Sequence, residues 1–335
     1  MEKRIKTLKE KVGIIACSSV GGKREGEGPI GTDFDYIDRT DRFGKETWEQ
    51  SEAESQYMAL NFALNKIDLS PQDLGVLLAG DLVNQCTSSA YGLLDYDTPF
   101  LGIYGACSTC AEGLLLAALL LDGGHFQRAA VVSSSHFCSA ERQFRSPLEY
   151  GGQRAPTAQW TVTGAGAFLL EREGTVPLAH ITEVLPGKTI NGGINDPANM
   201  GAAMAPAALD TLLAYFKESG KGPSDFDLIL TGDLGHEGSE ILRDLSSREG
   251  YCIDGIHNDC GLMIYDRHKQ DVHAGGSGCG CAATVLASKV IKDLEQGRIK
   301  NLLFMATGAL MSADSLKQGL TIPAIAHLVH LKGVK

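Results

Sequence analysis

The sequence carries two copies of the same order of motifs, and this internal duplication constrains the fold more than any other feature. An apolar run ending in Gly-Asp-Leu occupies residues 77–82 (LLAGDL), and a second occupies residues 228–234 (LILTGDL). A small-residue turn entering an apolar stretch occupies residues 105–122 (GACSTCAEGLLLAALLLD), and a second occupies residues 276–293 (GSGCGCAATVLASKVIKD). Repetition in a fixed order indicates a duplicated architecture.

Each copy predicts strands that alternate with helices. The Gly-Asp-Leu runs, RAAVVSSS from Arg128 and NLLFMATGA from Asn301 are typical of buried strands. The stretch 107–121 is apolar nearly all round, which requires burial on all sides, whereas the stretch from Cys279 has one apolar stripe. We therefore predict an α/β fold with mostly parallel sheets, a duplicated five-layer α-β-α-β-α sandwich with these two helices between two sheets.

The division of the chain follows from the same duplication. Residues 1–172 form the predicted first half and residues 173–335 the second, and we expect them to pack as one unit because no low-complexity linker separates them. One further helix is expected from Ser51, as its N-cap, to about Ile67, with Glu54 completing a capping box.

The charge of the chain argues against several kinds of partner. The 335 residues include 41 acidic and 30 basic side chains, a formal net charge of −11. Nucleic acids and anionic lipid surfaces require local cationic fields, so this chain is a poor match for them. No apolar stretch approaches the ~20 residues that span a bilayer, and the N-terminus does not have the pattern of a signal peptide. We expect a soluble chain without a transmembrane segment.

Nine cysteines raise the questions of disulfides and of zinc. An odd number, in a chain of this size without a secretory signal, argues against a disulfide framework. Cys279 and Cys281 are separated by one residue, unlike the ligands of structural zinc sites, and no histidine pair follows at finger spacing. We expect neither a metal site nor another cofactor in the chain.

Three segments carry motifs of a known kind. Residues 105–109 (GACST) form a small-residue turn around a cysteine, residues 163–167 (TGAGA) form a glycine-rich strand, and residues 275–333 contain a turn, a helix, a strand, a Gly-Ala turn and a last strand. Together they resemble the thiolase superfamily, and within it the ketoacyl synthase III-like branch. This resemblance implies the five-layer fold and places Cys107 at the position of the superfamily's nucleophile.

A closer resemblance is carried by seven runs in one order. They are AGDLVNQ (79–85), YGACSTC (104–110), SSSHFCSAERQFRSPLEYGGQ (133–153), DPANMGAAMAPAALDT (196–211), ILTGDL (229–234), HNDCGL (257–262) and AGGSGCGCA (274–282). In this order they are similar to the stage V sporulation AD family of endospore-forming bacteria, over residues 12–331. The resemblance implies a noncatalytic thiolase-like protein that binds dipicolinic acid, or its calcium chelate, for uptake into the developing spore and release in germination. It also implies that the chain acts together with the other stage V sporulation A membrane proteins. The chain would then be peripheral on the spore inner membrane.

Cys107 is the candidate nucleophile. The dipole at a helix N-terminus favours the thiolate, so we expect a lowered pKa, and the same N–H groups can bind a carboxylate. Condensation in the resembled superfamily also needs a histidine and an asparagine, or two histidines. The run 231–234 lacks the histidine, His236 has the wrong spacing, and Gly275 is followed by Gly276, not by asparagine. We therefore expect a vestigial nucleophile.

The ligand that the family resemblance implies determines which groups the site must offer. Dipicolinate is a flat pyridine ring with two carboxylates, so it needs a slot with donors at both ends, and arginine supplies bidentate donors. Ligands of α/β sheets usually bind at the carboxyl ends of strands, where residues 133–153 begin. The candidate ligand-binding residues are Cys107, His136, Arg142, Arg145, Tyr150, His257, Asn258, Gly276 and Ser277.

Each candidate also has a structural interpretation. Arg142 and Arg145 fit a solvated loop or a dimer contact equally well, and the polar run at residues 257–260 fits a turn. The two methionines of residues 196–206 suit a flat ligand but are more often core filler. Asp81 and Asp233 are expected to be buried hydrogen-bonding groups repeated by duplication.

Two other functions remain open from the sequence. One is an acyltransferase or condensing enzyme, dependent on acyl-CoA or an acyl carrier, because a thiol such as Cys107 can still accept an acyl group. The other is a structural subunit with a vestigial pocket that docks to membrane partners. A homodimer is a further expectation, because the resembled superfamily usually pairs its sheets.

Overall fold

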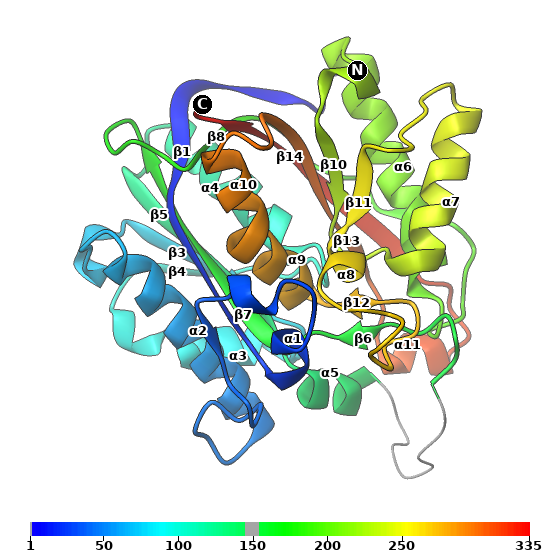
Figure 1. The fold of residues 1–335 in the computed structure, drawn as a ribbon, viewed down its shortest axis with the longest axis horizontal. Helices are drawn as coiled ribbons and strands as arrows, with labels where there is room; N and C mark the ends of the chain where they lie inside the picture. The colour runs from blue at the N-terminus through cyan, green and yellow to red at the C-terminus, as the bar shows by residue number, and fades with distance from the viewer. Residues whose placement is uncertain (1, 145–153) are drawn as a thin grey trace.

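The computed structural model describes residues 2–144 and 154–335 as a mixed α/β fold (Figure 1). The strands of its main sheet run in the order β11-β10-β13-β14-β8-β1-β7-β5-β3-β4. In chain order their bounds are β1 Lys6–Gly21, β3 Val76–Gly80, β4 Phe100–Gly102, β5 Arg128–Ser135, β7 Gly164–Arg172, β8 Ala179–Leu185, β10 Leu228–Thr231, β11 His257–Asp259, β13 Asn301–Ala309 and β14 Pro323–Gly333. Short strands β2 (Tyr36–Ile37) and β9 (Ile190–Asn191) pair with β1 and β14, and β6 (Trp160–Thr161) pairs separately with β12 (Gly276–Ser277).

The pairing pattern repeats between the two halves of the chain. In the first half β3 is parallel to β4 and β5, whereas β7 is antiparallel to β5 and β1. In the second half β10 is parallel to β11 and β13, whereas β14 is antiparallel to β13 and β8. The expectation of mostly parallel sheets is therefore wrong, because β7 and β14 each return against their neighbours. The duplication itself is visible in the strand order.

The two expected sheets are joined at β1. This strand has 16 residues. It pairs with β7 from Val12 to Gly21 and with β8 at Lys6, Thr7 and Val12 to Ile14, so its middle is hydrogen-bonded on both edges. The predicted division after residue 172 falls between β7 and β8.

Helices cover the outer faces and fill the space between the halves (Figure 1). Helices α2 and α3 pack on the first half, and α6 and α7 on the second. Helix α4 and the continuous helix of α9, a π-helical segment and α10 share one core with strands of both halves. The five-layer arrangement is confirmed. The bounds are α1 Lys23–Gly26, α2 Trp48–Asn65, α3 Thr87–Gly92, α4 Thr109–Asp122, α5 Phe137–Phe144, α6 Met200–Ser219, α7 Gly235–Arg248, α8 Cys260–Met263, α9 Cys279–Val285, the π segment Leu286–Val290, α10 Ile291–Glu295 and α11 Ala313–Lys317.

The start of α2 differs from the predicted one. Thr47 caps the helix, since its side chain accepts from Gln50 N at 3.3 Å while the Gln50 side chain accepts from Thr47 N. Ser51 lies inside the helix and its hydroxyl donates to Thr47 O at 2.7 Å. The sequence offers two such boxes four residues apart, and the earlier one is used because Trp48 and the residues after it continue the helix.

None of the helices in the described residues is both long enough and apolar enough to cross a bilayer. The apolar helix α4 has only 14 residues.

Candidate functional site

Cys107 lies on a tight turn just before α4. Ala106 has a left-handed backbone with φ of 52°. The carbonyl of Gly105 accepts from the backbone N of Ser108 at 3.1 Å and from its Oγ at 2.6 Å. Strand β13 closes on the turn at Gly308, where a Cβ atom would stand 2.2 Å from Gly105 O. Local hydrogen bonds and this close backbone contact together fix the position of the thiol, two residues before the helix begins.

The groups that face the thiol come from the second copy of the motifs. The Oγ atom of Ser277 lies 3.9 Å from the Sγ atom of Cys107 and donates to Asp233 Oδ2 at 2.9 Å. Asp233 also accepts from the backbone N of Gly278 and from the hydroxyl of Thr307, both at 2.9 Å. The expected role of Asp233 as a buried hydrogen-bonding group is confirmed.

The electrostatic surroundings of Cys107 oppose ionisation. Burial, and after it the neighbouring Asp233 carboxyl, raises the pKa of Cys107 well above that of an ordinary thiol, and the Ser277 hydroxyl offsets only part of this. Burial also raises the pKa of Asp233. The expectation of a lowered thiol pKa is wrong, because removal from water beside a carboxyl outweighs the dipole of the nearby helix.

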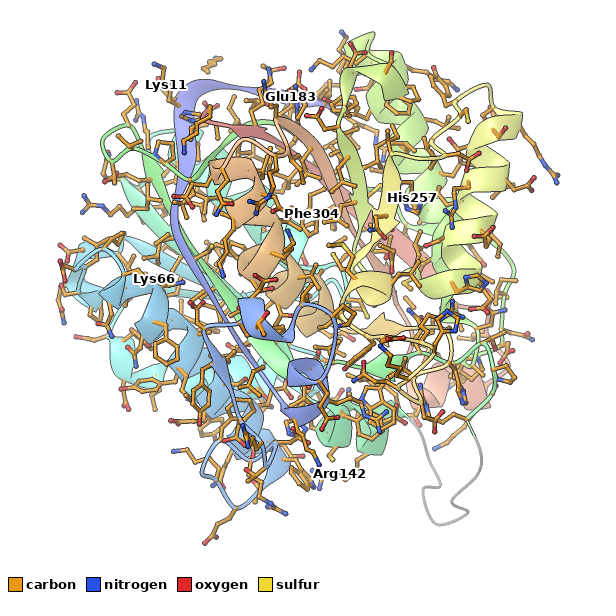
Figure 2. The ribbon with its side chains drawn as sticks, in the orientation of Figure 1. Lys11, Lys66, Arg142, Glu183, His257 and Phe304 are labelled. Carbon is orange, nitrogen blue, oxygen red and sulfur yellow. The ribbon has the colours of Figure 1, made fainter. Side chains whose placement is uncertain are left out.

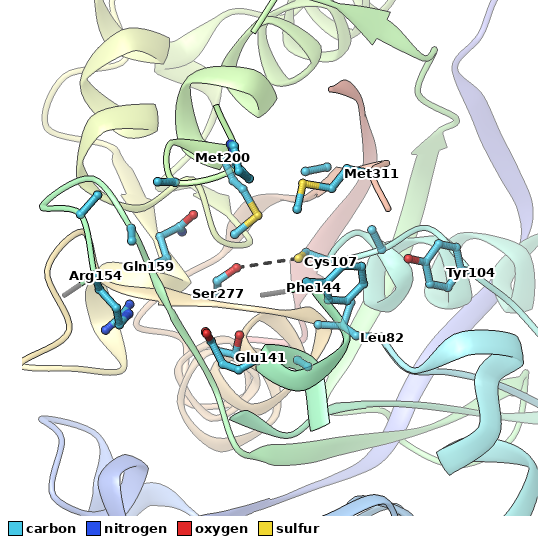
Figure 3. A pocket seen from close by; sticks show the side chains of 18 residues that line it. Leu82, Tyr104, Cys107, Glu141, Phe144, Arg154, Gln159, Met200, Ser277 and Met311 are labelled. Atoms are coloured by element: carbon cyan, nitrogen blue, oxygen red, sulfur yellow. Dashed lines mark hydrogen bonds between the residues drawn. The ribbon is translucent and has the colours of Figure 1, made fainter. Parts of the chain in front are cut away.

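A pocket of about 360 Å³ opens beside Cys107. Figure 3 shows Arg154 at one end and Tyr104 at the other, with Cys107 and Ser277 between them. The side chains of Met200 and Met311 form one side. Glu141 and Phe144 of α5 lie opposite them. The lining residues are Leu82, Tyr104, Ala106, Cys107, Ala140, Glu141, Phe144, Arg154, Ala155, Ala158, Gln159, Thr161, Pro197, Ala198, Met200, Ser277, Ala309 and Met311.

Arg154 is positioned by an aromatic stack at the edge of the pocket. Its guanidinium carbon lies 4.9 Å from the ring centroid of Trp160, and both Nη atoms are buried. The Trp160 ring stacks on Phe137 at 3.8 Å between centroids and carries the guanidinium of Arg24 at 3.9 Å. Because cations are attracted to indole faces, this stack holds a permanent positive charge at one end of the pocket.

The remaining polar lining is also ordered. Gln159 donates from Nε2 to Asp233 O at 2.5 Å and to Gly276 O at 3.0 Å, which ties the pocket floor to the second Gly-Asp turn. The hydroxyl of Tyr104 points toward Cys107 (Figure 3). Tyr104 is 45% exposed as a residue, yet partial burial raises the pKa of its phenol, so the hydroxyl stays a hydrogen-bond donor.

Two of the nine predicted site residues line this pocket, and a third adjoins it. Cys107 and Ser277 are lining residues, and Gly276 contributes its carbonyl to Gln159. Gly278 has φ of 102°, and a Cβ there would meet the Ser135 side chain at 2.6 Å. The glycine-rich turn is thus explained by packing against β5. Arg145 and Tyr150 lie outside the described residues.

The other four predicted residues lie away from the lining. His136 is buried and its Nε2 contacts Asp41 O at 2.8 Å. Arg142 is ion-paired with Glu49 on the surface. His257 contacts the Thr231 hydroxyl at 3.0 Å, and burial, then Arg243, lowers the pKa of His257 to about 4. Asn258 is exposed. Arg142 and His257 are widely separated in the molecule (Figure 2), so the predicted group does not form one site.

Sequence reasoning missed most of the pocket. Arg154 follows directly after the run 133–153, and Tyr104 is the first residue of the run 104–110, but neither was predicted as a site residue. Met200 belongs to the run that was noted for its methionines, whereas Met311 had no sequence signal. Their convergence depends on the contact between the two halves, which no single run encodes.

Fold and site together define a thiolase-like protein, with the same strand order in both halves and a thiol on the turn before the central helix. Solved structures agree. Cerulenin-bound OleA of Xanthomonas campestris superposes with a TM-score of 0.62 at 14% identity, over 99% of both chains. 3-Oxoacyl-[acyl-carrier-protein] synthase III from Aquifex aeolicus VF5 gives 0.58 at 14% identity, over 96% of this chain and 99% of that one. At such identity the likeness shows the fold alone.

The family is more specific than the fold. The family model "Stage V sporulation protein AD (SpoVAD)" matches residues 2–332. Stage V sporulation protein AD of Bacillus subtilis (strain 168) is 43% identical over 314 residues, which cover 94% of this chain and 92% of that protein. The chain belongs to the stage V sporulation protein AD family, and the resemblance carried by the seven runs is confirmed.

Proposed function

We propose that this chain binds dipicolinic acid, or its calcium chelate, in the Cys107 pocket without converting it, for uptake into the developing spore and release in germination. The observation that carries this proposal is the pocket itself. It has a buried guanidinium at one end, a phenol hydroxyl at the other and apolar sides, in a member of a sporulation family.

The pocket offers what a flat dicarboxylate needs. Arg154 can grip one carboxylate through two N–H groups, and the Tyr104 hydroxyl can donate to the second. Met200 and Met311 face Phe144 across the slot, which suits an aromatic ring. The volume of about 360 Å³ lies within the ~300–1,000 Å³ usual for small-molecule sites.

Three features support binding without catalysis. The pKa of Cys107 is raised by burial and by Asp233, so the thiol lacks the thiolate character of a nucleophile. The described lining residues include no histidine, asparagine or lysine. The carboxyl of Asp233 lies beside the thiol, where it would oppose the negative charge that develops in acyl transfer.

Either form of the ligand finds partners in the pocket. Calcium takes oxygen ligands, and Glu141 and Gln159 both present side-chain oxygens in the lining. In the free dianion Arg154 offsets part of the charge instead. The chelate and the free acid therefore differ in which lining groups offset their charge.

The proposed setting is a peripheral association with the spore inner membrane through other stage V sporulation A membrane proteins. The family membership supports it. Attachment through partners also fits a chain whose described helices do not cross a bilayer.

The proposal is tested by calorimetric titration of the protein with dipicolinate, once in the presence of a calcium chelator and once with calcium. We expect saturable binding of one ligand per chain in at least one arm. Benzene-1,3-dicarboxylate, which lacks the ring nitrogen, serves as the comparison ligand in both. No binding of dipicolinate at millimolar concentration in either arm would overturn the proposal for the isolated subunit.

The retained thiol favours one alternative, an acyltransferase or condensing enzyme that uses Cys107. Incubation with acyl-CoA followed by intact-mass measurement decides it. We expect no adduct, whereas an acyl adduct that disappears in Cys107→Ala would support the enzyme.

A further inference from the structure

Two carboxyl groups are buried one layer behind the pocket. Glu52 of α2 is 1% exposed and Asp81, just after β3, is fully buried. None of the ion pairs among the described residues includes either of them, although Glu49 pairs with Arg142 nearby. Asp81 precedes the pocket residue Leu82. Two unpaired acids in an apolar interior require an explanation, because burying a charge without a partner is costly.

A chain of hydrogen bonds through three side chains connects the two carboxyls. Gln56 Nε2 donates to the Oγ atoms of Ser89 at 2.9 Å and Ser134 at 2.7 Å. Ser89 Oγ donates to Asp81 Oδ2 at 2.6 Å, and Ser134 Oγ donates to Glu52 Oε1 at 3.0 Å. Both amide hydrogens and both hydroxyl hydrogens are thereby used, and no hydrogen of these groups remains for the other oxygen of Glu52.

The donors around each carboxyl identify which one is ionised. Asp81 accepts from the backbone N–H groups of Val83 at 2.9 Å and Ser89 at 2.8 Å, and such donors cannot reverse. Glu52 is approached only by hydroxyl groups, which can donate or accept. The arrangement therefore suits a carboxylate at Asp81 and a neutral acid at Glu52.

The hydroxyl of Ser139 connects Glu52 to the first turn of α5. Its Oγ lies 2.7 Å from Glu52 Oε2 and 3.1 Å from His136 O, and both of these are acceptors when Glu52 is ionised. One hydroxyl hydrogen cannot serve both. If Glu52 is protonated, it donates to Ser139, and Ser139 gives His136 O a second hydrogen bond beside the one from the backbone N of Ala140 at 3.0 Å.

We propose that Glu52 is a positioning residue for the pocket: it holds a proton in the ligand-binding state and, through Ser139, fixes helix α5 against the ligand. Helix α5 supplies Ala140, Glu141 and Phe144 to the lining. The inference rests on the proposed function, because it concerns the affinity of that same pocket. It makes affinity depend on a proton that the ligand never touches.

Glu52 is expected to lose its proton at a pH between the two values at which binding can be compared, 7 and 9. Burial, and after it the charge of Asp81, raises the pKa of Glu52 to about 8. Helix α3 and the end of β5 present only serines to it. Its own helix α2 adds Glu49. Among the described residues, the titratable or charged groups on the other elements around it are Asp81 after β3, Cys279 at the start of α9, and His136, Glu141 and Arg142 at or on α5.

The sign of the effect follows from the raised pKa. The folded state holds the Glu52 proton up to about pH 8, whereas an unfolded chain releases it near 4.5. The contribution of Glu52 to stability is fully present below the unfolded pKa and is lost as pH rises through about 8. In the same range Ser139 turns its hydrogen to Glu52, so His136 O keeps only the bond from the backbone N of Ala140 and the first turn of α5 is held less tightly.

The experiment compares wild type, Glu52→Gln and Ser139→Ala by dipicolinate titration at pH 7 and pH 9. Arg154 stays protonated and the raised pKa values of Cys107 and Tyr104 keep both neutral, so these three groups do not titrate in this window. We expect wild-type affinity to fall by about fivefold or more, the lower end of coupling between sites in proteins. Glu52→Gln, which fixes the neutral form, should bind equally at both pH values, and Ser139→Ala should lose most of the dependence.

A second measurement does not require a ligand. Amide exchange of residues 137–144 is compared between wild type and Glu52→Gln at the same two pH values. We expect faster exchange of α5 in wild type than in the variant at pH 9, with the difference absent at pH 7. Parallel behaviour of the two proteins at both values would overturn the inference. Failure of wild type to bind at pH 7 would instead count against the proposed function and leave the exchange result to decide the role of Glu52.

Discussion

Replacing Arg154 with alanine is expected to weaken dipicolinate binding by roughly ten- to hundredfold, because a hydrogen bond to a charged group is worth about 1.5–3 kcal/mol. Arg154 closes one end of the pocket and is held there against Trp160. Arg154→Lys keeps the charge but loses the planar fork, so its affinity should lie between wild type and the alanine variant. The dissociation constants are measured by calorimetry at fixed ionic strength.

Arg142→Ala is the matched control for this substitution. The Arg142 side chain is 58% exposed and pairs with Glu49 outside the pocket, so its loss should leave affinity unchanged. Thermal unfolding of each variant separates lost binding from lost folding. An Arg154→Ala protein that is folded and binds like wild type would remove Arg154 from the site.

Cys107 should react with iodoacetamide at pH 7.5 at least ~10-fold more slowly than Cys252 in the same protein, since each pKa unit changes the thiolate fraction about tenfold. Cys252 is an exposed thiol and serves as the internal reference, whereas Cys107 is buried beside Asp233. Peptide mass spectrometry of timed samples gives the two rates. The slow reaction is the chemical counterpart of a thiol that does not act as a nucleophile.

Two controls make this result specific. In denaturant the two cysteines should react at similar rates, because the difference comes from the fold. Asp233→Asn should speed the reaction of Cys107, since the neighbouring carboxyl contributes to its raised pKa. Labelling of Cys107 ahead of Cys252 in the native protein would contradict the account and return weight to acyl transfer.

Much of the fold could be predicted because the duplication is written in local motifs. The two Gly-Asp-Leu runs are β3 and β10 with the turns that follow them, and the two small-residue turns precede α4 and α9. The direction of β7 and β14 could not be predicted, because a return strand and a crossover strand have the same composition. The pairing of β1 with β8 also depends on contact between halves rather than on any run.

The site was less predictable, because it is assembled from loops of both halves. Cys107 and Ser277 carried a motif, and both line the pocket. Arg142 has the same chemistry as Arg154 and lies in a recognised run, yet a surface glutamate engages it. The pKa of Cys107 illustrates the limit most clearly: helix position argues for a lowered value, whereas the buried Asp233 that reverses it is 126 residues away (233 − 107).

The central claim, that this pocket is the dipicolinate site, is tested most directly by a crystal structure of the protein grown with saturating dipicolinate. The account predicts the ring between Met200, Met311 and Phe144, with one carboxylate on Arg154 and the Sγ atom of Cys107 unmodified. Ligand density at another place with this pocket empty, or a covalent adduct on Cys107, would contradict it.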